Sequence, residues 1–515
     1  MVTIHTRLVE LAGKPAADWL EAGRSLALAQ NLADASALLE SALVQHAHDS
    51  ELQLALASVR WQLHDHAGAQ ALLEALLARW PDHVAAALTL ARLHIEQDRS
   101  LMAERVLCDT FGKFRQPPDL VQRAARMLAA GGRKQGAADL CESAITLGAD
   151  DSSVRLYAAA LQSQLGDFAR ARTHYVYALE HDAKMVDAGA AYGLASITRY
   201  ADACHPDLTR FKTLLERPEL TPQARASVLF ALGKGYDDLA DYAHAATCLR
   251  QANALVDHRS WSRKNWRRAV EARLGGLPLP QRPLVVTEGI PLFVVGAPRS
   301  GTTLVAELLG RSPQVCNRGE LDWLPHFAAQ ISRAGKVDHA LLDQVAVAYL
   351  GKLQQGEAET RWFVDKQPLN FLHVDLALAL FAQARIIYCR RSQRDTALSI
   401  WSQHFDSPEY RFAYDFADIR TVLNGCEQLM TRARRDARVH EVRYEDLVRQ
   451  PQQIVSALAA ELGLPSFTWD MPKATRHAIG TASVWQARQP VYTRAIGRWR
   501  NYAQFVPELL HFADD

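Results

Sequence analysis

Small residues in the first half of the chain recur with a period of 34 positions. Five alanines follow this interval: Ala35, Ala69, Ala103, Ala137 and Ala171. Another small residue stands twelve positions before each of them: Gly23, Ala57, Ala91, Ala125 and Ala159. The residues between them are rich in alanine and leucine at helical spacing. Because two packed helices need small residues where their backbones approach closely, the pattern predicts one helix pair in each period.

The register continues at Gly193, but the next expected alanine is replaced by His205. It resumes at Gly233 and Ala245, 40 positions after Gly193, which indicates about six inserted residues near "RYADACHPDLTR". A helix pair every 34 residues resembles the tetratricopeptide repeat, here over roughly 17–256. This resemblance implies a solenoid whose concave face commonly binds extended peptides or partner proteins. A generic alanine-rich bundle is the alternative, but bundles do not keep one register over six units.

The pattern changes after the repeats. A basic, tryptophan-bearing stretch followed by prolines is interpreted as a capping helix and linker, with a nucleic-acid patch as the alternative. From Pro291, short apolar runs alternate with helical patterns, which is typical of an α/β fold. Four runs are predicted as buried parallel strands: 292–295, 362–365, 385–389 and 439–444. The predicted order is a helical-repeat domain at 1–256, capping helix and linker at 257–289, and an α/β domain at 290–515.

Composition and charge exclude several classes of protein. The 515 residues are 49% hydrophobic and 22% charged, as in soluble globular proteins. The net charge of the whole chain is +1, so its charge does not indicate nucleic-acid binding. No run approaches the roughly 18 apolar residues of a membrane span, and the start lacks the apolar core of a signal peptide. The seven scattered cysteines form no CxxC pair and the histidines show no metal spacing, so free thiols, no metal site and a cytoplasmic location are expected.

The first apolar run of the α/β region leads into "FVVGAPRSGTTLVAELL", which has the outline of a phosphate-binding loop. Gly296 and Gly301 have the GxxxxG spacing, and the helix that follows would present its N-terminal N–H groups to an anion. A kinase or ATPase has lysine at the position of Thr302, whereas the only cation of this loop is Arg299. The planar guanidinium suits a sulfonate and a phosphate side by side.

The motifs around this loop resemble the sulfotransferases that use 3′-phosphoadenosine 5′-phosphosulfate (PAPS), most closely the tyrosylprotein sulfotransferases. In chain order they are "PRSGTTL" (298–304), "GE" (319–320), "DKQP" (365–368), "RRSQRDTALS" (390–399) and "RYEDL" (443–447). Together with the repeats, they indicate a bacterial-type tetratricopeptide-repeat sulfotransferase. The implied fold is an all-α solenoid followed by a P-loop-like α/β domain with a parallel sheet. A sulfuryl group carries one negative charge, so its transfer requires neither a Mg²⁺ clamp nor the P-loop lysine.

The resemblance implies a nucleotide-binding role for several residues. The 5′-phosphosulfate loop corresponds to Arg299, Ser300, Gly301, Thr302 and Thr303. The 3′-phosphate site corresponds to Arg391 and Ser399, and a shift of one residue to Arg390 is the alternative. Tyr444 corresponds to a nucleotide-contacting tyrosine. Arg498 stands where the family has a lysine for the 3′-phosphate, so this correspondence is the least secure.

The resemblance also implies the catalytic groups. Glu320 corresponds to the general base, Lys366 to the lysine that stabilises the leaving group, and Ser483 to a catalytic serine. Arg299 is the fourth residue with an implied catalytic role. In direct in-line transfer, Glu320 would accept the proton of the attacking hydroxyl while the other three stabilise developing charge. The structural alternatives are that Glu320 caps the next helix and that Lys366 forms a loop salt bridge with Asp365.

The predicted function is sulfuryl transfer from PAPS to a hydroxyl, without a metal and with release of adenosine 3′,5′-bisphosphate. The favoured acceptor is a peptide or protein tyrosine held partly by the helical repeats. A small-molecule or saccharide hydroxyl remains an alternative acceptor. A P-loop kinase or NTPase, with Asp365 as its Walker-B aspartate, and a repeat scaffold with an inactive nucleotide fold are the rival classes. The sequence leaves the oligomeric state, including a homo-oligomer, open.

Overall fold

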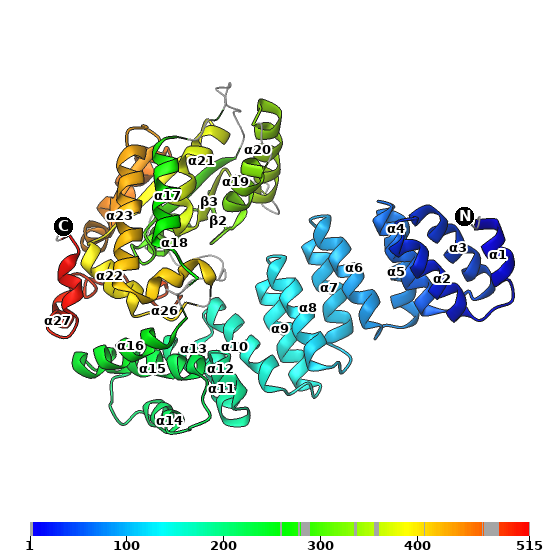
Figure 1. Cartoon of the computed structure of the whole chain (residues 1–515), viewed down its shortest axis with the longest axis horizontal. Coiled ribbons are helices and arrows are strands. Elements are labelled where there is room, and N and C mark those ends of the chain that lie inside the picture. The colour runs from blue at the N-terminus through cyan, green and yellow to red at the C-terminus, as the bar shows by residue number, and fades with distance from the viewer. Residues whose placement is uncertain are drawn as a thin grey trace. The chain divides into compact units, whose positions relative to one another are not determined.

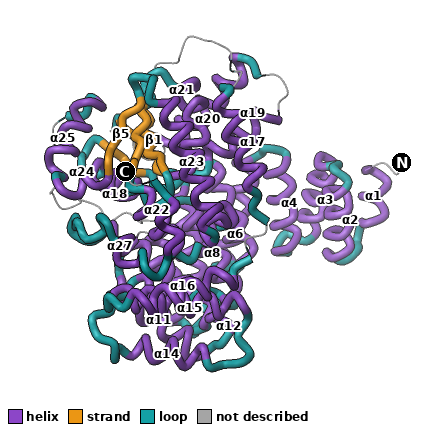
Figure 2. The backbone as a smooth tube through the Cα atoms, turned by 60° about the vertical axis from the view of Figure 1, so that its left-hand side comes forward, coloured by secondary structure: helices purple, strands orange, loops and turns teal. Residues whose placement is uncertain are grey.

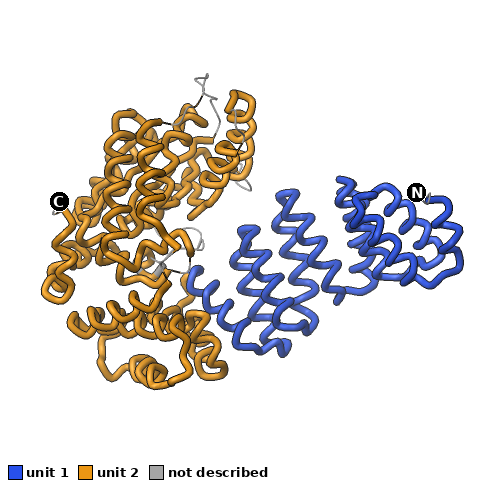
Figure 3. The backbone as a smooth tube through the Cα atoms, in the orientation of Figure 1, with its two compact units in different colours: residues 1–165 blue, residues 166–515 orange. Residues whose placement is uncertain are grey.

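The structure is a computed structural model that describes residues 4–257, 260–276, 279, 289–333, 337–354, 360–405, 407–465, 467 and 484–513. The chain forms two compact units, Met1–Leu165 and Gly166–Asp515 (Figures 1 and 3). The boundary expected at 257–289 rests on sequence pattern and not on compactness, so it stays a prediction. The last predicted repeats, 166–256, therefore belong to the same compact unit as the α/β region.

The first unit consists of helices that pack in consecutive pairs. They are α1 (Ile4–Leu11), α2 (Ala16–Leu28), α3 (Leu32–Gln45), α4 (Ser50–Gln62), α5 (His66–Arg79), α6 (Val84–Glu96), α7 (Ser100–Phe111), α8 (Pro118–Ala130), α9 (Lys134–Thr146) and α10 (Ser152–Leu165). The alanines of the 34-residue register, such as Ala57 of α4 and Ala69 of α5, have no exposed surface. A Cβ atom added to Gly23 would lie 2.6 Å from Leu39 of the next helix. The predicted series of helix pairs is confirmed.

The turn within each pair contains a residue with left-handed backbone, and this residue also recurs every 34 positions. The positive φ angles belong to Gln30 (61°), His64 (63°), Asp98 (60°), Gly132 (80°) and Gly166 (86°). At the first four of these positions the next backbone N–H donates to the carbonyl five positions earlier, as Asp65 does to Arg60 at 2.9 Å and Arg133 to Leu128 at 2.8 Å. This 6→1 hydrogen bond beside a left-handed residue is the Schellman motif of helix ends. Each of these four turns is thus specified by local hydrogen bonds.

The second unit begins with the remaining helices of the repeat region. They are α11 (Phe168–His181), α12 (Lys184–Asp187), α13 (Ala190–Ser196), α14 (Pro206–Leu215), α15 (Pro222–Asp238), α16 (Tyr242–Leu255) and α17 (Arg263–Leu274). The predicted insertion is α14 with the loop before it, and His205 caps this helix by accepting from the Asp207 N–H. The register resumes at Gly233 in α15 and Ala245 in α16, which are both buried. The helix α17 lies in the stretch expected to cap the repeats.

The described residues of the second unit also contain a five-stranded parallel sheet in the order β2-β3-β1-β4-β5. Its strands are β1 (Ile290–Gly296), β2 (Val315–Asn317), β3 (Trp362–Lys366), β4 (Arg385–Arg390) and β5 (Val439–Arg443). Four of them coincide with predicted runs. The three-residue β2 is too short to show a hydrophobic pattern, so the sequence analysis missed it.

Helices cover both faces of this sheet (Figure 2). Leu292 and Val294 of β1 pack with α18 (Thr302–Leu309) and α25 (Pro451–Leu462). Phe293 and Val295 pack in the opposite core, which includes α20 (His339–Gln354), α21 (Val374–Leu380) and α23 (Phe416–Ala433). The other elements are α19 (Trp323–Arg333), η1 (Pro368–His373), α22 (Gln393–Trp401), η2 (Pro408–Tyr414), α24 (Tyr444–Arg449), α26 (Val484–Ala487), α27 (Trp499–Tyr502) and η3 (Pro507–His511). The predicted fold class, helical repeats followed by an α/β domain, is confirmed.

Candidate active site

Five of the predicted site residues lie at or directly after the carboxyl ends of the five strands. Arg299 follows β1, Glu320 follows β2, Lys366 ends β3, Arg391 follows β4 and Tyr444 follows β5. The strands are parallel and in register, with Val294 of β1 opposite Lys366 and Gly296 opposite Cys389. Ligands of open α/β sheets bind at this edge, so the topology brings residues from five distant motifs together.

Two glycines shape the loop after β1. Gly296 has a φ of 149°, and a Cβ atom added there would lie 2.4 Å from the carbonyl oxygen of Cys389. Gly301 has a φ of 101° directly before α18, and an added Cβ atom would lie 2.7 Å from the ring of Tyr444. Both positions therefore exclude larger residues. The loop leads into the N-terminus of α18, whose first residues, Thr302 and Thr303, are buried.

Arg299 is the centre of a group of side chains from three motifs. Its backbone is left-handed, with a φ of 69°. Its Nε donates to Ser399 Oγ of α22 at 3.1 Å, and its carbonyl oxygen accepts from Arg391 Nη1 at 3.0 Å. The Arg391 guanidinium also lies over the ring of Tyr444, 4.6 Å from its centroid. The structure thus brings together the loop, Arg391, Ser399 and Tyr444 as the motifs predicted.

Positive charge accumulates around this loop. Burial is the main reason that the pKa of Arg299 lies below its ordinary value, and the neighbouring Arg391 and Arg498 lower it further. The hydroxyl of Ser300 is buried, and it has no hydrogen-bond partner among the described residues. Buried polar atoms are normally paired, so this hydroxyl and the arginines suit an anionic ligand with several oxygens.

Glu320 and Lys366 form the second part of the site. Lys366 Nζ donates to Glu320 Oε1, and the lysine side chain is almost fully buried whereas the glutamate is 26% exposed. Burial is the main cause that lowers the pKa of Lys366, and the attraction of Glu320 opposes it. The lysine therefore pairs with Glu320, not with Asp365 as the salt-bridge alternative required. A carboxylate and an ammonium in direct contact provide a proton acceptor and an electrostatic donor at one place.

Asp365 belongs to a buried network beside this pair. Its Oδ2 atom accepts a hydrogen bond from the Tyr349 hydroxyl, and Asn370 Nδ2 lies 3.5 Å from the same oxygen. Burial raises its pKa to about 7, against the pull of the Tyr349 hydrogen bond and of Lys366. The aspartate therefore links β3 to α20, which bears Tyr349.

The remaining predicted residues differ in their surroundings. Arg498 donates to Asp237 of α15, with 2.7 Å between Nη2 and Oδ1. Arg390 forms ion pairs with Glu427 at 3.5 Å and Glu441 at 3.9 Å. Ser483 lies outside the described residues, so the structure does not place it. The roles assigned to all of these residues stay predictions.

The sequence analysis missed two carboxylates that hold the C-terminal segment. Asp395 of α22 accepts from the backbone N–H groups of Gly497 at 2.6 Å and Trp499 at 2.9 Å. Its place inside the "RRSQRDTALS" motif was a signal that could have found it. Asp237 lies in the helical repeats, 261 positions before Arg498, where no motif marks it.

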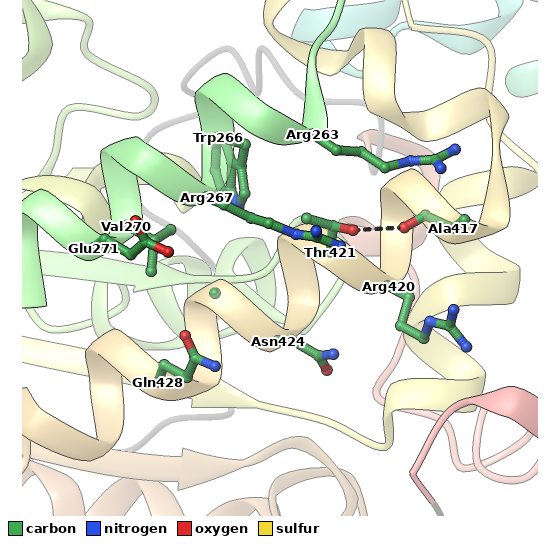
Figure 4. A pocket seen from close by; sticks show the side chains of 11 residues that line it. Arg263, Trp266, Arg267, Val270, Glu271, Ala417, Arg420, Thr421, Asn424 and Gln428 are labelled. Atoms are coloured by element: carbon green, nitrogen blue, oxygen red, sulfur yellow. Dashed lines mark hydrogen bonds between the residues drawn. The ribbon is translucent and has the colours of Figure 1, made fainter.

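A separate hollow of about 460 Å³ lies between α17 and α23 (Figure 4). None of the predicted site residues lines it, and its Arg263 is already paired with Asp415 at 3.0 Å and with Asp418. Arg267 and Arg420 contribute exposed guanidinium groups to the same hollow. These exposed arginines provide a comparison for the partly buried Arg299 and Arg391 of the candidate site.

Neither a metal-ligand cluster nor a membrane helix emerges from the part of the chain that the structure describes. No three His, Cys, Asp or Glu side chains among these residues are grouped to hold a metal ion. No described helix has the length and apolar character needed to cross a bilayer.

Two stretches of the chain match known families. Residues 291–470 match the sulfotransferase family, and residues 60–107 match the tetratricopeptide repeat. The α/β region is therefore a sulfotransferase-family domain and the helical pairs are tetratricopeptide-like, which confirms both resemblances.

Three curated proteins are similar to parts of the chain. An uncharacterized protein of Aquifex aeolicus is 29% identical over 339 residues, which cover 59% of this chain and 43% of that protein. Nodulation protein NoeE of Sinorhizobium fredii is 28% identical over 214 residues, which cover 33% of this chain and 49% of that protein. Protein-tyrosine sulfotransferase 1 of Danio rerio is 27% identical over 250 residues, which cover 42% of this chain and 68% of that protein. The chain thus spans about half the length of the first two relatives.

Two solved structures are similar to parts of the chain. The sulfotransferase domain from the Synechococcus PCC 7002 olefin synthase is 22% identical, with a TM-score of 0.32 over 46% of this chain and 98% of that domain. A thermophilic tetratricopeptide-repeat protein of Thermus thermophilus is 23% identical, with a TM-score of 0.23 over 35% of this chain and 99% of that protein.

Proposed function

We propose that this chain transfers a sulfuryl group from PAPS to the hydroxyl of a tyrosine in a peptide or protein. The observation that carries the proposal is the presence, at one edge of the sheet, of an anion loop with Arg299 and Arg391 and of the Glu320–Lys366 carboxylate–ammonium pair, whose lysine is buried. The first suits the nucleotide's sulfate and phosphates, and the second suits removal of a hydroxyl proton. Sulfotransferase membership of residues 291–470 supports the same reaction class.

Two groups of residues would hold PAPS. The loop 299–303, with the Ser300 hydroxyl and the N-terminus of α18, would bind the 5′-phosphosulfate. Arg391 and Ser399, with Arg498 nearby, would bind the 3′-phosphate. The contact between Arg299 and Ser399 brings these two sets of donors within one hydrogen bond of each other. The nucleotide supplies the sulfuryl group, and the chain supplies position and charge.

The acid–base chemistry falls to the Glu320–Lys366 pair, of which only the lysine is buried. Glu320 accepts the proton of the acceptor hydroxyl while that oxygen forms its bond to sulfur. The bond between sulfur and the bridging oxygen breaks, and the negative charge passes to adenosine 3′,5′-bisphosphate. Lys366 and Arg299 donate hydrogen bonds to these oxygens, so they stabilise charge that develops in the transition state. Because Lys366 is fixed in advance by Glu320, little reorganisation is needed at the moment of transfer.

An aromatic surface near Glu320 favours a phenolic acceptor. Tyr410 stacks on Phe405, with ring centroids 4.7 Å apart and an interplanar angle of 14°. Burial is the main cause that raises the pKa of Tyr410, and the negative charge of Glu320 raises it further. A flat acceptor ring would pack against such a pair. A tyrosine hydroxyl, with an unperturbed pKa of about 10, is also a stronger acid than a sugar hydroxyl, so a carboxylate deprotonates it more easily.

Calorimetry and an acceptor screen test the proposal in two stages. Adenosine 3′,5′-bisphosphate should bind without added metal, whereas adenosine 5′-phosphate and ATP should bind far more weakly. Transfer from labelled PAPS is then measured to tyrosine peptides, simple phenols, glycans and small alcohols. Turnover of a glycan or alcohol without any tyrosine peptide would exclude the proposed acceptor. Preference for ATP would exclude the proposed donor and favour a kinase-like NTPase.

A shortened chain tests whether the repeats hold the acceptor. The cut belongs between Leu165 and Gly166, because residues 166–256 share a hydrophobic core with the α/β region. If the repeats bind peptides, residues 166–515 should sulfate simple phenols at the rate of the full chain but long tyrosine peptides more slowly. Equal rates on long peptides would leave tyrosine as the acceptor and remove the role of the first repeats.

A further inference from the structure

The segment before and within α27 is fixed to the anion site from one side. Arg391 Nη2 donates to the carbonyl oxygen of Ala495 at 2.8 Å, while its Nη1 holds the carbonyl of Arg299. Asp395 accepts from the N–H groups of Gly497 and Trp499. The backbone on both sides of Arg498 is therefore tied to residues of the "RRSQRDTALS" motif.

A residue of the helical repeats fixes the same segment from the other side. Asp237 Oδ1, near the end of α15, accepts from Arg498 Nη2 at 2.7 Å and Nε at 3.3 Å. The same oxygen accepts from the Tyr502 hydroxyl at 2.6 Å. The side chains of Arg498 and Asp237 are only 24% and 22% exposed. Arg498 thus has a fixed direction, and its charge reaches Arg299, whose pKa it lowers.

The packing around these contacts makes α15 and α16 part of the sulfotransferase region. Phe230 of α15 and Leu249 of α16 lie in one core with Phe293 of β1 and Tyr502 of α27. The ring of Tyr502 also lies 5.2 Å from that of Tyr242, at the start of α16. The position of Asp237 is therefore set by the same core that positions the central strand.

We infer that Asp237, a residue of the helical repeats, is a positioning residue for the anion site, acting through Arg498. The inference rests on the proposed function, in which Arg498 binds the 3′-phosphate. A free arginine would lose rotamer freedom when it binds a phosphate, and Asp237 removes that loss in advance by holding the guanidinium in place. The helical repeats are then a structural part of the nucleotide site as well as a peptide-binding array.

Substitution of Asp237 separates positioning from simple charge. Loss of a carboxylate beside an anion site would by charge alone tighten the binding of an anion. If positioning dominates, Asp237→Asn in the full chain should weaken adenosine 3′,5′-bisphosphate binding about tenfold, the scale of one charge-assisted hydrogen bond. The same substitution in an Arg498→Ala background should have no further effect. Tighter or unchanged binding by Asp237→Asn, or additive effects in the double variant, would overturn the inference.

A matched control distinguishes positioning from loss of the fold. Glu508 of η3 pairs with Arg250 of α16 at 2.7 Å, so it links the two neighbouring elements, α16 and η3, without contacting Arg498. Glu508→Gln should lower the melting temperature as Asp237→Asn does but leave bisphosphate binding unchanged. Equal losses of binding in both variants would mean that Asp237 is merely structural. If Asp237→Asn does not fold, Tyr502→Phe replaces it, and this variant should weaken binding by about threefold.

The unmodified chain distinguishes a failure of the proposed function from a failure of the role inferred for Asp237. If the unmodified chain fails to bind adenosine 3′,5′-bisphosphate, the proposed donor is wrong. If it binds and Asp237→Asn binds equally well, the proposed function survives and the role of Asp237 is wrong.

Discussion

The turns of the helical repeats and the anion loop both contain left-handed residues, but they hold them by different means. In the repeats the residue is Gln, His, Asp, Ala or Gly, and a 6→1 backbone hydrogen bond defines the turn. In the loop the residue is Arg299, whose carbonyl is held by Arg391, 92 positions away. The left-handed conformation costs a non-glycine residue about 1–2 kcal/mol in both places.

The difference shows where strain serves a purpose. The repeat turns accept almost any residue because the geometry comes from the backbone and the side chain is not needed. Glycine would relieve the strain of the loop, but it would remove the guanidinium that contacts Ser399. Strain that persists at a position with a required side chain is typical of functional sites. We therefore expect changes in the site to remove chemistry and changes in the turns to alter stability alone.

The largest expected effect concerns Glu320. The change Glu320→Gln keeps the shape of the side chain but removes the proton acceptor, so turnover should fall by about 10²–10⁴-fold. Binding of adenosine 3′,5′-bisphosphate should stay nearly intact. Transfer from labelled PAPS and calorimetry on the same sample measure the two quantities. Turnover close to that of the unmodified chain would assign the base to another group or to water.

The next effect concerns the contact that holds the strained loop. Arg391→Ala removes donors to the loop carbonyl and to the proposed 3′-phosphate, so it should weaken bisphosphate binding by about 1.5–3 kcal/mol. Adenosine 5′-phosphate should be affected much less, as calorimetric titrations of both ligands would show. Arg420→Ala, which removes an exposed arginine of the α17–α23 hollow, is the control for general loss of charge. Equal weakening of both ligands would exclude a 3′-phosphate site at Arg391.

The stability of the folded chain should also depend on pH through Asp365, which lies next to Lys366 of the candidate site. Because the folded chain raises the pKa of Asp365 from 3.8 to about 7, its contribution to stability is present below pH 4 and lost as the pH rises through about 7. Between pH 3.8 and about 7, this effect lowers the free energy of unfolding by up to about 1.4 kcal/mol per pH unit. Asp365→Asn should remove this pH-dependent decrease. Denaturant unfolding at pH 4 to 8 measures the difference between the two proteins.

Asp436 provides the opposite case for the same experiment. Its hydrogen bond with Arg438 lowers its pKa, so its stabilising contribution is present above pH 4 and lost on acidification. Asp436→Asn should therefore destabilise the chain at neutral pH more than in acid. Parallel pH profiles for both variants would contradict the assignment for Asp365.

The smallest effect is expected in the repeat turns. Gly132→Ala should cost about 1 kcal/mol, because an added Cβ atom meets nothing within 4 Å and only the backbone conformation opposes it. The reverse change, Ala240→Gly, relieves a φ of 60° and should stabilise the second unit by up to about 1 kcal/mol. Denaturant unfolding measures both, and turnover should not change. A loss of turnover in either variant would mean that the turns are coupled to the site.

The helix pairs could be predicted because their specification is local and repeated. Ala57 and Ala69 occupy places where any larger residue would separate two helices, so their period is visible in the sequence. The left-handed turns repeat with the same period but escaped notice, because the 6→1 bond tolerates different residues at that place. Their regularity lies in the backbone and not in residue type.

The site could be predicted only where a motif concentrates its residues. The motifs identified Arg299, Arg391, Ser399 and Tyr444, which the structure brings into contact, and they identified the Glu320–Lys366 pair. The link between Asp237 and Arg498 joins residues that are 261 positions apart, one in the helical-repeat region and the other in the C-terminal part of the α/β region. Only the shared core around Phe230 and Phe293 makes them neighbours, and no local pattern encodes such a contact.

The division at Leu165 also limits how the array can grow or shrink. Each 34-residue period before this point carries its own turn and contacts mainly its neighbours, so duplication or deletion of one whole period there changes length and leaves the next junction intact. The same event after Gly166 would displace the helix that bears Asp237 and remove core residues of the sheet. Lineages of this architecture should therefore differ in period number toward the N-terminus and keep a constant number of residues between Gly166 and β1.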